Sequence, residues 1–274
     1  MKRDAAPERP RRAFTIVELL VSTGLLVLII ALLLSAVSQT SAVWTRAQAQ
    51  VTTFQQARAA FDAMTRNLSQ ATLNPYWRAF DRATSGRVDY AYVRESDLHF
   101  ISGPAADAEL VGGNAEQQPA HAVFFQAPLG ATSVSNPTLL GRPKYAPLSH
   151  LLTACGYWVE WTNGMENLPP FLREDFPKWP ERWRFRLHEL QQRTELLGIF
   201  DPAKQTSPTQ WLQDALSERT SAGAYTQARV MAENVVALVI LPKLAERDRE
   251  APAGVADLTA DYHYDSRAPL TGTG

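Results

Sequence analysis

Hydrophobic and polar residues divide this 274-residue chain into one long apolar run near the N-terminus and a mixed remainder. From Leu19 to Val37 no residue is charged, and leucine, isoleucine, valine and alanine dominate. As a helix this run would be about 28 Å long, close to the roughly 30 Å hydrocarbon core of a bilayer. We therefore predict a transmembrane helix over residues 14–38, preceded by a leader at 1–13. The apolar residues expected in the span are Leu19, Leu20, Val21, Gly24, Leu25, Leu26, Val27, Leu28, Ile29, Ile30, Leu32, Leu33 and Leu34.

The helical pattern continues beyond the membrane-length run. Between Gly24 and Pro75 the sequence has neither glycine nor proline, and after Gln39 it becomes rich in alanine, glutamine, arginine and threonine. We expect an extra-membrane continuation of the same helix over residues 39–73, ended by Asn74-Pro75. An apolar stripe at helical spacing predicts that this part packs on a sheet. The stripe consists of Val51, Phe54, Phe61, Met64 and Leu68.

Short apolar stretches in residues 74–274 predict strands, and several short strands after one long helix indicate an α+β domain with an antiparallel sheet. We expect the strands predicted at 87–93 and 98–101 to be neighbours separated by residues 94–97. In the strand predicted at 182–187, Trp183, Phe185 and Leu187 alternate with three arginines. We interpret these arginines, Arg182, Arg184 and Arg186, as a solvated basic face rather than an anion site. The predicted strands are residues 87–93, 98–101, 121–126, 156–162, 182–187 and 235–241.

The segments between these strands are long and hold many of the 18 prolines and 14 glycines. We expect surface loops at 103–119, 127–147 and 163–180. A helix is predicted over 204–216, with Trp211 and Leu212 on its buried side.

Charge and cysteine content exclude several classes of function. The formal net charge is −1, and without the leader, which holds five basic and two acidic residues, it is −4. This balance gives no reason to expect a nucleic-acid partner. The single Cys155 forbids an internal disulfide and is expected to be a small buried hydrophobe.

Charged residues beside the apolar run indicate its orientation in the membrane, and they include one carboxylate whose position is unusual. Lys2, Arg3, Arg9, Arg11 and Arg12 predict a cytoplasmic leader, with everything after Val37 directed outward. Glu18 stands near the start of the apolar helix, where a charge is expensive in lipid. It therefore needs a neutralising partner or a functional role.

The sequence Arg11-Arg12-Ala13-Phe14-Thr15-Ile16-Val17-Glu18 resembles the N-terminal signal of type IV prepilins and pseudopilins. The resemblance implies that a prepilin peptidase cuts between Ala13 and Phe14 and that Phe14 is then N-methylated. It also implies a pilin-like fold, a long helix packed on an antiparallel sheet. The chain departs from the family pattern at Ala13, where glycine is usual, and at Ile16, where leucine is commoner.

Cleavage would create a positively charged amine at Phe14, one helical turn from Glu18. In a filament the carboxylate of one subunit would pair with the terminal amine of its neighbour, setting register and rejecting unprocessed subunits. The alternative is a protonated Glu18 that faces lipid headgroups near the membrane surface.

More of the chain also resembles prepilin-like proteins. Residues 54–73 look like the helix of minor pseudopilins of the J type in type II secretion. Continued through residues 74–77, with 97–100, 156–161 and 261–265, the resemblance is closer to the Verru_Chthon cassette protein C family. These are prepilin-like proteins of Verrucomicrobia and their relatives, and the resemblance supplies no established activity.

Two other interpretations of the N-terminus stay open. A plain signal anchor explains the length of the apolar run and its basic flank, but leaves Glu18 without a role. A cleaved secretory signal has a shorter apolar region and a small-residue site after it, for which Ser35-Ala36-Val37-Ser38 is a weak candidate.

Candidate catalytic and metal-binding residues are scattered. None of the five histidines, His99, His121, His150, His188 and His263, forms a pair with metal-ligand spacing, and we interpret them as structural or solvent-facing. Asp257, Asp261 and Asp265 offer oxygen ligands for Ca²⁺ but lack the spacing of a strong calcium loop. We expect no enzyme and no cofactor.

Three functional classes follow: a filament subunit, a membrane-tethered binding protein, and an exported enzyme on a stalk. We expect the first, a minor structural subunit of a type IV pilus-like or type II secretion-like filament. The expected partners are the prepilin peptidase/N-methyltransferase, other pilin-like subunits through the N-terminal helix, and membrane lipid. The expected location is the inner membrane, crossed once, with residues 74–274 as a periplasmic or extracellular head.

Overall fold

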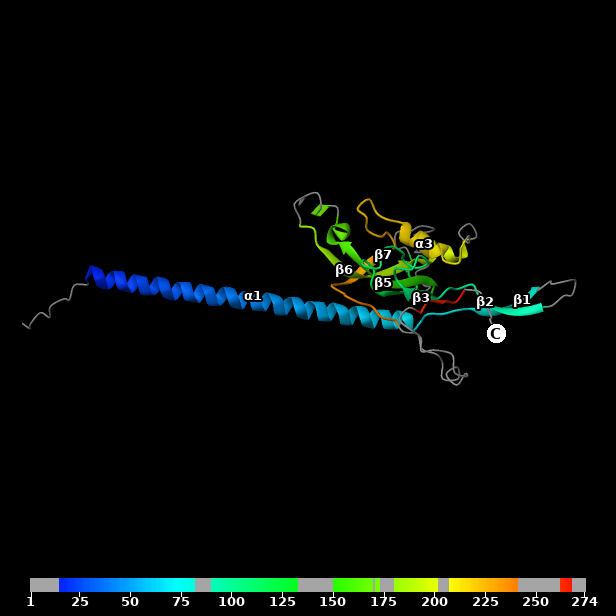
Figure 1. The fold of residues 1–274 in the computed structure, drawn as a ribbon, viewed down its shortest axis with the longest axis horizontal. Helices are drawn as coiled ribbons and strands as arrows, with labels where there is room; N and C mark the ends of the chain where they lie inside the picture. Colours follow the sequence, from blue (N-terminus) through cyan, green and yellow to red (C-terminus); the bar gives the residue numbers. More distant parts are fainter. Residues whose placement is uncertain are drawn as a thin grey trace, which may run out of the picture. The chain divides into compact units, whose positions relative to one another are not determined.

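A computed structural model describes residues 15–81, 90–132, 150–169, 171–172, 180–201, 207–240 and 262–267. The chain forms two compact units, residues 1–52 and 53–274. The first holds most of one long helix, and the second holds the end of that helix together with the sheets and short helices (Figure 1).

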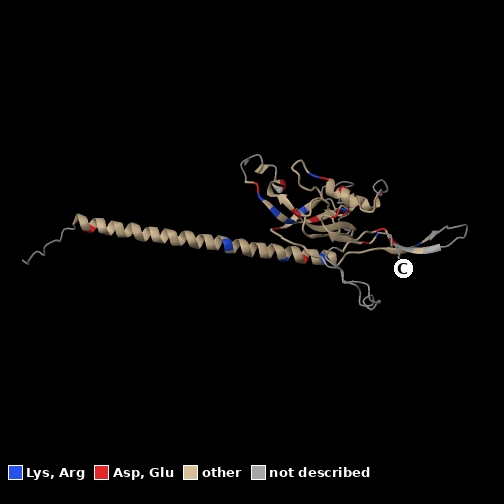
Figure 2. Ribbon diagram, in the orientation of Figure 1, with Lys and Arg blue, Asp and Glu red and all other residues tan. Residues whose placement is uncertain are grey.

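The helix α1 spans Ile16–Leu68, 53 residues. All residues from 15 to 52 are exposed, and no residue between Glu18 and Arg46 is charged (Figure 2). Within the described residues, α1 is the one helix that is long and apolar enough to cross a membrane, by length and composition. The prediction of one long apolar N-terminal helix is confirmed.

The helix ends five residues before the predicted end at residue 73. After Leu68 the backbone tightens, because the amides of Gln70 and Ala71 donate to the carbonyls of Asn67 and Leu68 at 3.1 and 3.0 Å. The amide of Thr72 then donates to the carbonyl of Gln126 at 3.0 Å. A backbone bond to the sheet therefore replaces the last helical turn that the sequence suggested.

A six-stranded antiparallel sheet forms the centre of the second unit, with the order β7-β6-β5-β4-β3-β8. Together with α1 it confirms the α+β class. The predicted strands at 121–126 and 156–162 lie inside β4 and β5, and most of 182–187 lies in β6. The bounds are β3 Ile101–Pro104, β4 His121–Ala127, β5 Thr153–Asn163, β6 Trp183–Gln192, β7 Ala228–Glu233 and β8 Tyr264–Asp265.

A separate two-stranded antiparallel sheet pairs β1, Pro75–Asp81, with β2, Tyr90–Ser96, in the register Pro75↔Ser96. The prediction that residues 87–93 and 98–101 form neighbouring strands is wrong, because β2 pairs with β1 and β3 lies in the larger sheet. Residues 94–96, expected to separate two strands, belong to β2. Residues 87–89 lie outside the described part of the chain.

The predicted strand at 235–241 is also wrong. Residues 235–240 form no helix or strand, and residue 241 lies outside the described residues. Two backbone amides connect this segment to the sheet: His121 donates to the carbonyl of Leu238 at 2.9 Å, and Val235 donates to that of Phe185 at 3.3 Å. The strand at the sheet edge is β7, which comes directly before this segment.

Short helices lie within the long connections. They are η1 Gly164–Asn167, η2 Thr194–Leu196, η3 Gly198–Phe200 and α3 Gln210–Ser217. The predicted burial of Trp211 and Leu212 is confirmed, although α3 begins later than residue 204, and residues 202–206 are not described. The predicted loop at 103–119 is confirmed from residue 105 onward, whereas 133–149 lie outside the described residues.

The six-stranded sheet is covered on both faces, which gives two cores. Cys155, Tyr157 and Val159 of β5 belong to a cluster with Ala60 of α1, against which Met64 and Leu68 pack. Ala154 and Trp158, on the opposite face of β5, belong to a cluster with Trp211 and Leu212 of α3. Successive side chains of β5 point to opposite faces of the sheet, so one set belongs to the core with α1 and the other set to the core with α3.

Part of the predicted apolar stripe of α1 faces away from the sheet. Phe54 is 75% exposed, Phe61 is 61% exposed and Val51 is also exposed, whereas Ala60 is buried. The prediction that these three pack on the sheet is therefore wrong. The buried Ala60 and the partly buried Met64 and Leu68 follow at steps of four residues, and the small Ala60 side chain leaves room for the helix against the strands.

Candidate anchoring and processing site

The start of α1 is stabilised by a local exchange of hydrogen bonds between Thr15 and Glu18. Thr15 immediately precedes the helix, and its Oγ1 accepts a hydrogen bond from the amide of Glu18 at 3.3 Å. The same hydroxyl lies 3.5 Å from Glu18 Oε2 as a donor. Thr-x-x-Glu before an apolar run is the sequence signature of a capping box, and the bond from the Glu18 amide to the Thr15 hydroxyl is one half of that arrangement. Ala13 and Phe14, the predicted processing site, lie outside the described residues.

Hydroxyl groups near the start of α1 are satisfied within the helix itself. Ser22 Oγ donates to the carbonyl of Glu18 at 2.6 Å, and Thr23 Oγ1 donates to that of Leu19 at 3.0 Å. Such bonds to the preceding turn remove the need for water around short polar side chains. The apolar residues predicted for the span, from Leu19 to Leu34, all lie in α1 and are exposed. This lateral surface is suited to lipid or to a second apolar helix.

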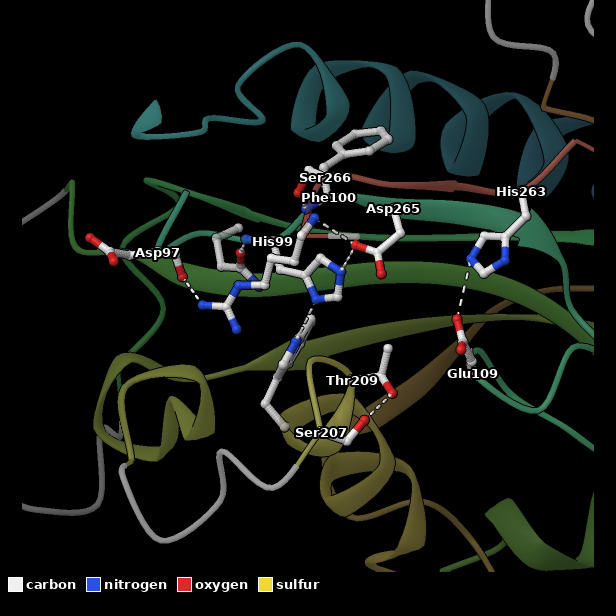
Figure 3. Close-up of polar contacts among 12 residues, drawn as sticks. Asp97, His99, Phe100, Glu109, Ser207, Thr209, His263, Asp265 and Ser266 are labelled. Atoms are coloured by element: carbon white, nitrogen blue, oxygen red, sulfur yellow. Dashed lines mark hydrogen bonds and ion pairs between the residues drawn. The ribbon is translucent and has the colours of Figure 1, made fainter. Parts of the chain in front are cut away.

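The head contains a buried His–Asp pair, which Figure 3 draws. His99 is 0% exposed, and its Nε2 lies 2.6 Å from Asp265 Oδ1. Its Nδ1 accepts a hydrogen bond from the indole of Trp211 at 3.1 Å. An indole N–H only donates, so Nδ1 is unprotonated and Nε2 carries the proton that points at Asp265. Both ring nitrogens are occupied, so this histidine holds structure and has no nitrogen left to activate a nucleophile.

Asp265 belongs to a C-terminal segment, residues 262–267, that closes the edge of β3. The amide of Phe100 donates to Ser266 Oγ at 2.8 Å, and the amide of Ser266 donates to the carbonyl of Phe100 at 3.0 Å. The guanidinium of Arg267 donates to the carbonyl of Asp97. Asp265 was a candidate calcium ligand, but it bonds His99 instead. Asp257 and Asp261 lie outside the described residues, and among those described no three His, Cys, Asp or Glu residues form a metal-binding group.

A second polar network connects α1 to the sheet. Asn67 Nδ2 donates to the hydroxyl of Tyr157 at 2.8 Å, and that hydroxyl donates to Glu189 Oε1 at 2.9 Å. Arg229 Nε donates to Glu189 Oε2 at 2.6 Å, which neutralises the buried carboxylate. Burial raises the pKa of the neighbouring Cys155 thiol to about 12. The predicted burial of Cys155 is confirmed, and the high pKa makes the thiol inert.

The basic face predicted for residues 182–187 is solvated only in part: Arg182 is exposed and Arg184 is half-buried, whereas Arg186 is only 2% exposed. Its Nε donates to Glu233 Oε1 at 3.3 Å, its Nη2 donates to the carbonyl of Arg182 at 3.2 Å, and its Nη1 donates to the carbonyl of Thr162. Arg184 pairs with the same Glu233 at 3.0 Å. The interpretation failed at Arg186 because β7 brings Glu233 beside β6, which no local pattern in 182–187 indicates.

The remaining histidines lie in different surroundings. His188 is buried between Trp158, with ring centroids 5.3 Å apart, and Tyr225, at 5.5 Å. Burial, and then the charges of Arg186 and Arg219, lower the pKa of His188 to about 3. His263 lies 3.3 Å from Asp107 and, as Figure 3 shows, beside Glu109, at 3.9 Å, and His150 is exposed.

Comparison of the chain with protein-family models, with curated proteins and with solved structures found no match. A function is therefore inferred from residues and geometry alone. The apolar helix with its one early carboxylate is the part of the molecule that points to a specific role.

Proposed function

We propose that the chain is a prepilin-like structural subunit of a type IV pilus-like or type II secretion-like filament, with α1 as its membrane anchor and assembly helix. Processing by a prepilin peptidase between Ala13 and Phe14 would release the leader, and N-methylation would follow at Phe14. The proposal assigns no catalytic step to the head and places it outside the inner membrane.

The observation that carries this proposal is the position of Glu18. It is the only charged residue of α1 before Arg46, and it lies at the first turn of a helix whose side chains are all exposed as far as residue 52. A carboxylate in such a helix is costly unless it meets a positive group. The amine of a processed Phe14 on a neighbouring subunit would supply that group.

The second unit supports the same proposal. The chain passes from the exposed apolar helix into the sheet-packed residues Ala60, Met64 and Leu68 without a break in α1. Asn67 then fixes the helix end to Tyr157. A subunit that transmits its position in a filament to an outer head would need such a continuous helix.

The capping box gives a competing role to Glu18 and favours a second candidate function. If the carboxylate only stabilises the first helical turn, the chain is a single-pass, membrane-anchored exported binding domain. An anchor of this kind needs no peptidase and no neighbouring subunit.

Intact mass and N-terminal sequence of membrane-extracted protein, produced with and without a prepilin peptidase, test the proposal directly. We expect a peptidase-dependent loss of residues 1–13 and one added methyl group on Phe14. An unprocessed chain in both preparations would overturn the proposal and leave the anchored binding domain.

Two substitutions separate the charge of Glu18 from its role in the cap. Glu18→Gln removes the charge, but glutamine still completes a capping box. Thr15→Val removes the capping hydroxyl and keeps the carboxylate. A filament subunit should fail to assemble with Glu18→Gln and should still assemble with Thr15→Val. Normal assembly of Glu18→Gln would indicate that the carboxylate acts only locally.

A further inference from the structure

The uncharged length of α1 exceeds that of its strictly apolar part. Between Glu18 and Arg46 every residue is uncharged. These 27 residues extend about 40 Å as a helix, which matches the ~40–45 Å of a bilayer with its headgroup regions, whereas Leu19 to Val37 match only the hydrocarbon core. The distance between the two charges therefore indicates where the outer surface of the bilayer would lie.

Polar side chains between Val37 and Arg46 are compatible with a poorly hydrated environment. Thr40 Oγ1 donates to the carbonyl of Ala36 at 2.9 Å, and Thr45 Oγ1 donates to that of Ser41 at 2.9 Å. Gln39 Nε2 donates to Ser35 Oγ at 3.4 Å. Each of these groups finds its partner one turn earlier in the same helix, as polar side chains do in membrane helices.

Trp44 and Arg46 stand at the end of this uncharged length. Trp44 is 72% exposed, and Val43 beside it is exposed as well. No described residue forms an ion pair with Arg46. An indole prefers the boundary between acyl chains and headgroups, and a guanidinium binds phosphate through paired hydrogen bonds.

We propose that Trp44 and Arg46 form the outer membrane-interface anchor of α1 and bind the phosphate-containing headgroups of the outer leaflet. The embedded part of the helix then extends from Glu18 to Arg46 and includes the polar residues Ser38 to Ser41. This inference rests on the proposed membrane anchor. Charge complementarity between Arg46 and lipid phosphate, and the agreement in length, identify lipid as the occupant of this helix surface.

The depth of Trp44 is measurable in the full chain, reconstituted in vesicles of phosphatidylcholine with a minor share of phosphatidylglycerol. The fluorescence difference between wild type and Trp44→Phe isolates this tryptophan from the other six. Bromines placed near the headgroup should quench it at least about twofold more strongly than bromines near the acyl-chain ends. A Trp44 signal that neither lipid quenches would place the residue in water and overturn the proposal.

A second variant separates this inference from membrane anchoring itself. Leu28→Trp, introduced into the Trp44→Phe chain, puts a reporter in the middle of the apolar run. Quenching of this reporter by the deep bromines, without quenching of Trp44, would retain the anchor and reject the interface. If neither reporter is quenched, the helix does not enter the bilayer and both proposals fail.

The role of Arg46 has its own matched control on the same helix. Arg46→Gln should lower the ratio of shallow to deep quenching of Trp44 toward one, because the helix loses its link to the phosphates. Arg58→Gln, which removes an exposed arginine three turns further along, should leave the ratio unchanged. An unchanged ratio in both variants would exclude Arg46 from the anchor.

Discussion

Polar side chains are satisfied in opposite ways in the two units of the molecule. Along the first part of α1, threonine and serine hydroxyls bond to carbonyls four residues earlier, as Thr40 does to Ala36. In the head, polar groups bond not only to near neighbours but also across long sequence separations: Asn67 to Tyr157 over 90 residues and His99 to Asp265 over 166. The polar side chains in the first part of α1 therefore find their partners within the helix, whereas these long-range hydrogen bonds of the head form only in the complete fold.

This difference predicts that substitutions in the two units have unequal effects on stability. Gly156 of β5 and Gly24 of α1 provide a matched pair. A Cβ at Gly156 would lie 2.0 Å from Cδ1 of Phe124, whereas a Cβ at Gly24 would have nothing within 4 Å. We expect Gly156→Ala to lower the free energy of unfolding of the head by about 3 kcal/mol and Gly24→Ala to leave it unchanged. Urea unfolding followed by tryptophan fluorescence measures both, and equal effects would contradict the comparison.

The buried His188 predicts a pH-dependent loss of stability in the head. Its folded pKa of about 3 lies below the ordinary value of 6.5, so the unfolded chain binds a proton that the folded chain rejects as the pH falls. Stability due to this group is complete above pH 6.5 and declines by about 1.4 kcal/mol per pH unit toward pH 3. Between pH 6.5 and 5 the loss is therefore about 2 kcal/mol.

Comparison of wild type with His188→Phe isolates this contribution from that of acidic groups. Phenylalanine retains an aromatic ring between Trp158 and Tyr225 but cannot bind a proton. The variant should lose less stability than wild type over the same pH range, while His150→Phe, at an exposed position, should behave like wild type. Identical pH profiles for all three proteins would contradict the burial of a neutral imidazole.

Removal of single hydrogen bonds should give the smallest effects. Asn67→Ala deletes the donor to Tyr157 and should cost about 1–2 kcal/mol, because a buried hydroxyl and carboxylate lose a partner. Thr40→Val deletes a bond within one turn of α1 and should change unfolding of the head by less than about 0.5 kcal/mol. The same unfolding experiment tests the pair, and a Thr40→Val effect as large as that of Asn67→Ala would show that the units are not independent.

The same contrast explains which features were predictable from the sequence. The long helix and the strands β4, β5 and β6 were recognisable because periodicity and composition are local signals. β1 was missed because Pro75 was interpreted only as a helix end, although proline is tolerated at the first residue of a strand. The burial of Arg186 depends on Glu233, 47 residues away, and a single sequence gives no signal for such a pairing.

The residues of the candidate site and of the His–Asp pair also differ in how far the sequence predicts them. Glu18 and the basic leader were identified from sequence, because charge beside an apolar run is visible without a structure. The cap formed with Thr15 was also visible as Thr-x-x-Glu. His99 and Asp265 form their contact only after β3 and β8 pair, and neither residue has a local pattern that predicts its partner.

The closing of β3 by residues 262–267 also has a consequence for the order of events during synthesis. His99 leaves the ribosome 166 residues before Asp265, an interval of roughly 10–30 s at ordinary rates of translation. Throughout that interval β3 would lack its β8 partner, and an unpaired strand edge can join another chain. The nascent head is therefore most exposed to misassembly late in translation, long after the apolar helix has emerged and become available for targeting to the membrane.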